Sequence, residues 1–157
     1  MKFLGLIFAS WLMLYTAAAE TLDIRDYEAP DVCRPGTTQV EVTVTGVTAK
    51  GILAVELYRP SDRHFLKKAS RVKRIRVPAA DGDQTVCFDV PKPGAYAVAT
   101  YHDKDGDRDL DQKWNGMPKE PFGLSTNAKL KFGFPSFYDA DFEVPAEGTA
   151  ITIVLRK

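Results

Sequence analysis

Five aspartates lie at alternate positions of the segment YHDKDGDRDLDQKWNG, residues 101–116, and are the strongest candidates for chemistry in the chain. On one face of a strand their carboxylates would repel one another, and Asp is a poor strand former. The spacing therefore predicts a loop whose carboxylates converge on a cation. Calcium binds about six to eight oxygens in a flexible shell, so this pattern favours calcium. A solvated acidic turn is the alternative. The predicted metal ligands are Asp103, Asp105, Asp107, Asp109 and Asp111.

The same spacing resembles an EF-hand calcium loop with Asp103 at its first position. Two positions depart from that pattern: Arg108 stands where the sharp-turn glycine is expected, and Trp114 stands where the last glutamate is expected. A distant carboxylate, Glu120 or Asp139, is a candidate to complete the shell. The predicted ligands are all hard oxygen atoms, which argues against zinc. Magnesium or a transition metal is a further alternative to calcium. Additional candidates for ligand or outer-shell roles are His102, Trp114, Glu120 and Asn127.

A basic segment, residues 59–76, contains eight Lys or Arg residues and one Asp, a local charge of +7. Its functional interpretation is a patch for an anionic envelope component such as lipid headgroups or a polysaccharide. The alternative is a solvated edge strand that Lys and Arg protect from aggregation. The chain as a whole has no net charge, which argues against nucleic-acid binding.

The N-terminal stretch MKFLGLIFASWLMLYTAAA, residues 1–19, has the composition of a secretory signal peptide. We expect cleavage after Ala19, a periplasmic or secreted protein, and no transmembrane span after cleavage; an uncleaved anchor is the alternative. Export to an oxidising compartment predicts a disulfide between Cys33 and Cys87, with two free thiols as the alternative.

Alternating apolar and polar residues predict a single all-β domain, residues 20–157. Short strands separated by turns indicate a seven-stranded antiparallel β-sandwich of Ig-like or prealbumin-like type. A short helix is expected only at residues 61–70. The predicted strands are residues 39–46, 52–59, 70–78, 84–91, 94–102, 139–145 and 149–157.

The long connection, residues 102–137, is rich in aromatic residues, so we predict a structured loop that folds back on the sheets. Its aromatic residues either form the loop's own core or line a ligand groove. No nucleophile elbow, phosphate loop or zinc motif is present in the sequence, which argues against an enzyme. A hydrolase with its site in this long loop is kept as an alternative.

Residues 94–144 resemble the bacterial secreted domain-of-unknown-function family 2141. The resemblance implies an exported β-sandwich similar to prealbumin-like or Cna-B-like modules, and it implies no reaction. Thr126 departs from the family pattern, where Asn is expected. The matching residues are Gly94, Tyr96, Ala97, His102, Asp103, Asp105, Asp107, Leu110, Asp111, Gly116, Pro118, Glu120, Gly123, Ser125, Pro135, Phe137 and Ala140.

Together these observations predict an exported, non-enzymatic module that serves binding or envelope structure. Its acidic loop would be ordered by calcium, because a bound ion stabilises the folded form by mass action.

Overall fold

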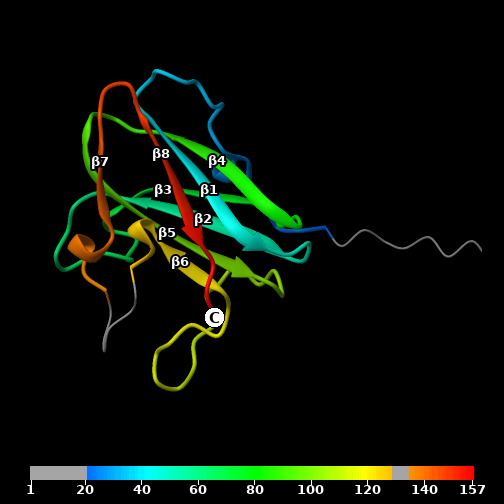
Figure 1. The fold of residues 1–157 in the computed structure, drawn as a ribbon. Helices are drawn as coiled ribbons and strands as arrows, with labels where there is room; N and C mark the ends of the chain where they lie inside the picture. Colours follow the sequence, from blue (N-terminus) through cyan, green and yellow to red (C-terminus); the bar gives the residue numbers. More distant parts are fainter. Residues whose placement is uncertain (1–20, 129–134) are drawn as a thin grey trace, which may run out of the picture.

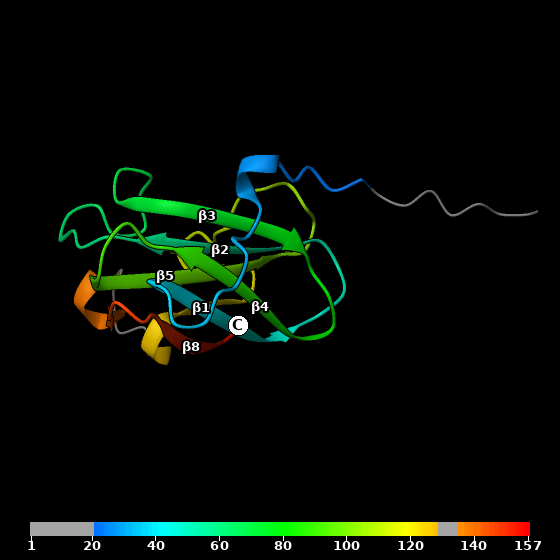
Figure 2. The same ribbon diagram turned by 90° about the horizontal axis from the view of Figure 1, so that it is seen from above.

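The protein is built mainly from two β-sheets that face each other across a shared apolar core (Figure 1, Figure 2). The computed structural model describes residues 21–128 and 135–157. The predicted signal peptide, residues 1–19, and part of the predicted long loop, residues 129–134, lie outside the described residues. In the ranges that are described, no helix is long and apolar enough to cross a membrane.

The smaller sheet has three strands, and its central strand has one antiparallel and one parallel neighbour. The parallel pairing follows from the turn that precedes the last strand. Gly148 of that turn has φ +81°, and an added Cβ there would lie 2.3 Å from the carbonyl oxygen of Thr37. Only glycine allows the chain to turn so close to the start of the central strand. In order, the strands are β4 (Gly82–Asp89), β1 (Gln39–Val47) and β8 (Thr149–Val154).

The larger sheet carries the acidic loop at the end of its longest strand, β5. A further short strand, β7 (Asp141–Val144), pairs with the first half of β5. Three short 3-10 helices complete the described elements: η1 (Asp26–Glu28), η2 (Ser125–Asn127) and η3 (Phe137–Asp139). In order, the main strands of this sheet are β3 (Arg71–Pro78), β2 (Ile52–Tyr58), β5 (Gly94–Asp103) and β6 (Phe122–Leu124).

Two details of the predicted fold are corrected by the structure, whose described residues form eight strands and a mixed smaller sheet. The additional strand is β6, which lies inside the connection predicted as a loop. It has three residues, too few to show an alternating pattern. The parallel pairing of β8 with β1 escaped prediction because alternation identifies a strand and not its direction.

The predicted alternation correctly identified the core between the sheets. In the smaller sheet, Val40, Val42 and Val44 of β1 are fully buried, and Phe88 of β4 is buried beside them. The larger sheet contributes residues of β2, β3 and β5 to the same cluster, such as Val55. The apolar area removed from water by this cluster is the main stabilising contribution to the fold.

The predicted disulfide between Cys33 and Cys87 is present and fixes the N-terminal segment to β4. Two contacts of Asp31 reinforce this attachment: its backbone N–H donates to the carbonyl oxygen of Cys87, and its carboxylate pairs with Lys73 of β3 at 2.7 Å. The segment therefore spans from β4 of one sheet to β3 of the other (Figure 2).

A second, smaller apolar cluster lies on the outer face of the larger sheet. Phe65 packs edge-on against Tyr58 of β2 and against Phe137 of η3, with ring centroids 5.5 Å and 5.8 Å apart. The segment 61–70 that supplies Phe65 forms turns and not the predicted helix. Leu66 has φ 63° there, and a left-handed residue cannot continue a right-handed helix.

Candidate metal centre

Asp103, the last residue of β5, has a fully buried carboxylate that shapes the acidic loop. One carboxylate oxygen, Oδ1, accepts the backbone N–H of Gly106 at 2.7 Å, and Oδ2 accepts the backbone N–H of Arg108 at 2.8 Å. These two hydrogen bonds turn the chain back on the carboxylate, so the residues after β5 form a curled loop, as predicted. Gly51 lies against this point, and an added Cβ there would be 2.1 Å from the Asp103 carbonyl oxygen.

Arg108 occupies the position where the EF-hand pattern has glycine, and it adopts the backbone conformation that glycine favours, with φ 77°. A left-handed conformation costs a non-glycine residue about 1–2 kcal/mol. Contacts of the guanidinium offset that cost. The Nη2 group of Arg108 donates to Glu28 at 3.0 Å, and its Nη1 group donates to the carbonyl oxygen of Asp23. The N-terminal segment therefore holds the acidic loop in place through Arg108.

Glu120 approaches Asp103 from the other end of the loop and is 9% exposed. Its Oε1 atom accepts the backbone N–H of Lys104 at 2.8 Å. Its Oε2 atom is buried and has no hydrogen-bond partner among the described residues. Leaving a buried carboxylate oxygen without a partner costs free energy, and native structures usually satisfy such an atom with an ordered water or an ion.

Three carboxylates converge at this point, from Asp103, Asp105 and Glu120. One oxygen of each lies within 4.8 Å of the other two, close enough for all three to contact one ion at calcium–oxygen distances of about 2.3–2.6 Å. Burial raises the pKa of Glu120, and the nearby charge of Asp103 adds to the effect. Burial likewise raises the pKa of Asp103, with neighbouring carboxylates adding to it. A hard cation would relieve this repulsion.

The remaining predicted ligands lie outside this three-carboxylate group. Asp107 accepts the backbone N–H of Asp109 at 2.9 Å, which forms a local turn. Asp111 pairs with Lys119 at 3.2 Å, and both side chains of that pair are about half exposed. The structure therefore brings together two of the five aspartates, with Glu120 as the third carboxylate.

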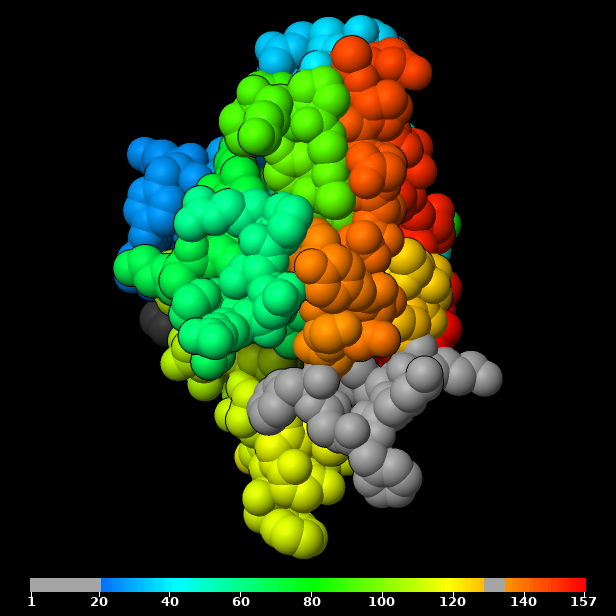
Figure 3. Space-filling view, turned by 90° about the vertical axis from the view of Figure 1, so that its left-hand side faces the viewer, coloured from blue at the N-terminus to red at the C-terminus, as the bar shows by residue number. Residues whose placement is uncertain are grey.

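Residues 111–119 form a small hairpin that projects from one end of the molecule, where it is coloured yellow (Figure 3). The backbone N–H of Lys119 donates to the carbonyl oxygen of Asp111 at 2.8 Å, and that of Lys113 donates to the carbonyl oxygen of Met117 at 2.7 Å. Trp114 lies at the tip and is 99% exposed. It occupies the EF-hand ligand position in sequence but stands apart from the carboxylate group.

The other candidate ligands have structural partners elsewhere. His102 is fully buried, and its Nε2–H donates to the carbonyl oxygen of Lys50 at 2.7 Å. Asn127 bonds to the backbone of β8 through both side-chain atoms, at 2.9 Å to Thr152 and 2.8 Å to Val154. Asp139 accepts the backbone N–H and the hydroxyl of Ser136 at the start of η3.

A buried charge network contacts the acidic loop beside the candidate metal centre, and the sequence did not predict this network. Arg76 of β3 is 1% exposed and pairs with Glu28 of η1. The Nη2 group of Arg76 also donates to the carbonyl oxygen of Arg108 at 2.7 Å and to the hydroxyl of Tyr101 at 3.3 Å. Burial opposes ionisation of Glu28, but the N–H of Arg25 and the charges of Arg76 and Arg108 outweigh it and lower its pKa.

Within the described residues, Ser125 and His102 of the long loop do not pair with each other. Ser125 is fully buried, and its hydroxyl bonds to the backbone of Val98 and Ala140. His102 contacts Lys50 and not Ser125. The serine hydroxyl therefore joins β5 to the residue just before β7, which is a structural role.

Ion pairs neutralise part of the basic segment. Arg71 and Arg74 pair with Glu56, and Lys73 pairs with Asp31. The exposed basic residues of the segment outside these pairs lie between β2 and β3: Arg59, Arg63, Lys67 and Lys68.

Comparison with known proteins identifies one family. The model of DUF2141, described as an uncharacterized protein conserved in bacteria, matches residues 42–152. No curated protein and no solved structure matches the chain.

Proposed function

Because the chain belongs to the bacterial family DUF2141, whose description names no reaction, we propose its function from the site itself. The protein is a non-enzymatic β-sandwich module of prealbumin-like type that serves binding or envelope structure. Its acidic loop is ordered by one calcium ion held by Asp103, Asp105 and Glu120.

The observation that carries this proposal is the Oε2 atom of Glu120, which is buried without a hydrogen-bond partner beside two other carboxylates. Three carboxylates gathered at one point repel one another unless a cation is shared. Oxygen is the only donor type in the group, which suits calcium or magnesium and not zinc. Calcium is the better fit because its shell is flexible and accepts water and carbonyl oxygens at irregular angles, whereas magnesium requires near-ideal octahedral geometry.

The proposal includes export, with a signal peptide cleaved after Ala19 and a periplasmic or secreted mature protein. Its support is the disulfide between Cys33 and Cys87, since disulfides persist chiefly in oxidising compartments.

Substituting Glu120→Gln tests the calcium proposal through two opposite effects on thermal stability. At free calcium about one hundred times Kd, binding stabilises the wild-type protein by about 2.7 kcal/mol. This corresponds to a rise in Tm of several degrees for a domain of this size. Glu120→Gln should abolish the rise. In chelator the same variant should melt at or above the wild-type Tm, because the raised pKa of Glu120 means that folding disfavours its ionised form.

Asp111→Asn is the matched variant for this experiment, because it also removes one carboxylate of the acidic run but lies outside the three-carboxylate group. It should keep the calcium-induced rise in Tm. A wild-type Tm that is the same in calcium and in chelator would reject the proposal. If Asp111→Asn loses the calcium-induced rise in Tm and Glu120→Gln keeps it, the calcium site does not include Glu120.

A second candidate function is binding to an anionic surface through the basic segment. Its support is a hollow between η1 and β3 whose lining is mostly basic, including Arg25, Lys68, Lys73 and Arg74. The protein should then bind vesicles that contain phosphatidylglycerol, and binding should weaken as salt rises. Equal binding to purely phosphatidylcholine vesicles, or no binding to either, would remove this candidate.

A further inference from the structure

A pocket on the outer face of the larger sheet is separate from the metal centre and has a different character. It has a volume of about 350 Å³, within the range of small-molecule sites. Small residues of β5 and β6, such as Ala99 and Gly123, form its floor. The hairpin of residues 111–119 forms one wall, and Leu66 also lines the pocket.

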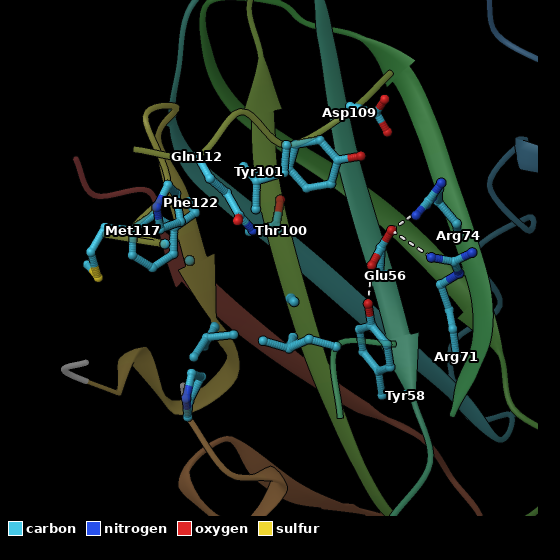
Figure 4. A pocket seen from close by; sticks show the side chains of 18 of the residues that line it. Glu56, Tyr58, Arg71, Arg74, Thr100, Tyr101, Asp109, Gln112, Met117 and Phe122 are labelled. Carbon is cyan, nitrogen blue, oxygen red and sulfur yellow. Dashed lines mark hydrogen bonds and ion pairs between the residues drawn. The ribbon is translucent and has the colours of Figure 1, made fainter. Parts of the chain in front are cut away.

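One end of this pocket is charged (Figure 4). Glu56 of β2 is buried, and its Oε1 atom accepts hydrogen bonds from Arg71 and Arg74 of β3. Its Oε2 atom accepts the hydroxyl of Tyr58. Burial, and then the Glu56 charge, raise the pKa of Tyr58, so that hydroxyl stays protonated and donates. Three donors therefore satisfy the Glu56 carboxylate, and it needs no ligand.

Unlike the Glu56 carboxylate, the guanidinium groups of Arg71 and Arg74 keep hydrogen-bond donors without a partner among the described residues. Two guanidinium groups share one carboxylate, which leaves a surplus of one positive charge at this end. The two Nη groups of Arg74, and the Nε and Nη2 groups of Arg71, have no hydrogen-bond partner among the described residues. Their side chains are only 27% and 17% exposed. The lining also contains Arg108, which pairs with Glu28 and Asp23, and the carboxylate of Asp109, so the formal charge of the whole lining is +1.

The opposite end of the pocket is apolar. Phe122 and Met117 lie across the pocket from the arginines (Figure 4), and Leu124 and Pro118 belong to the same lining. An anion at the charged end would pair with partly desolvated guanidinium groups, which are strong partners for carboxylates. A hydrocarbon body would cover the apolar end.

We propose that this pocket binds a small amphiphile with a single anionic head, such as a medium-chain carboxylate. The head lies toward Arg74 and Arg71, and the hydrocarbon chain lies between the floor at Ala99 and the apolar wall at Phe122 and Met117. This site is additional to the calcium site and does not depend on it.

The experiment is calorimetric titration of the full protein with dodecanoate below its micelle concentration. Dodecanol and dodecyltrimethylammonium carry the same chain with a neutral or a positive head. The titrations are done in chelator, which avoids calcium soaps and keeps the outcome independent of the calcium proposal. Dodecanoate should bind with a stoichiometry of one and roughly tenfold or more tightly than either comparator, since charged hydrogen bonds contribute about 1.5–3 kcal/mol.

Two variants test where the ligand binds, and a third serves as a control. Arg74→Met should weaken dodecanoate binding roughly tenfold or more and leave dodecanol binding unchanged. Ala99→Leu fills the floor and should weaken both ligands. Arg63→Met makes the same chemical change on an exposed arginine outside the pocket and should change nothing.

Three results would overturn the proposal. No binding of dodecanoate rejects a carboxylate amphiphile. Equal binding of dodecanoate and dodecanol, unchanged in Arg74→Met, rejects the anionic head. Undiminished binding in Ala99→Leu, with a circular dichroism spectrum like the wild type, places the ligand elsewhere.

Discussion

Glu28→Ala should lower the free energy of unfolding by about 3–5 kcal/mol, because it leaves a buried guanidinium without its partner. Arg76 is 1% exposed and Glu28 is 2% exposed, so water cannot replace the lost carboxylate without opening the structure. The same carboxylate also holds Arg108, so the variant loosens the acidic loop as well. Urea unfolding monitored by circular dichroism measures the effect.

Lys119→Ala provides the comparison, because it removes one partner of an exposed ion pair. The side chains of Lys119 and Asp111 are 54% and 47% exposed, and pairs of this kind contribute about 0–1 kcal/mol. If Glu28→Ala costs no more than Lys119→Ala, the buried network is not a main support of the fold. The double variant Glu28→Ala with Arg76→Met should recover part of the loss, because it also removes the stranded charge.

Removing the disulfide should cost about 2–4 kcal/mol by the chain-entropy model. The bridge joins residues 54 apart in sequence, so reduction greatly increases the freedom of the unfolded chain. The double substitution of Cys33 and Cys87 by alanine isolates this effect from the chemistry of free thiols. Unfolding in guanidinium, compared with the wild-type protein, measures it.

Reducing agent supplies an independent check on that value. Dithiothreitol should lower the stability of the wild-type protein toward that of the double-alanine variant and should leave the variant unchanged. A variant as stable as the oxidised wild type would show that the contacts of Asp31 with Cys87 and Lys73 hold the N-terminal segment without the covalent bond.

The features predicted best from the sequence are those encoded by local pattern. Val40, Val42 and Val44 alternate with polar residues, and an alternating strand with one buried face can point them only into the core. The disulfide followed from the combination of two cysteines with a predicted export signal. Asp103 was named as a metal ligand from the spacing of the acidic run, and that role stays a prediction.

The features that escaped prediction depend on contacts between distant segments. Glu28 and Arg76 are 48 residues apart, and each resembles an ordinary surface charge in sequence. Glu120 was a secondary candidate, although its Oε2 atom is the one carboxylate oxygen of the cluster that is buried without a hydrogen-bond partner among the described residues. Asp107 follows the EF-hand spacing, but its carboxylate accepts the backbone N–H of Asp109 in a local turn. Spacing predicts a loop, whereas the fold decides which of its carboxylates meet.

The central claim is that a hard divalent cation is held where three carboxylates converge, and direct calcium binding tests it most simply. The purified protein is freed of metal, equilibrated by dialysis against labelled calcium and compared with Glu120→Gln. We expect saturation at one calcium ion per chain in the wild-type protein and no calcium binding in the variant. Extracellular calcium modules bind with dissociation constants as weak as about 1 mM, so free calcium of about 10 mM is sufficient. A wild-type protein that retains no calcium at that concentration would contradict the account.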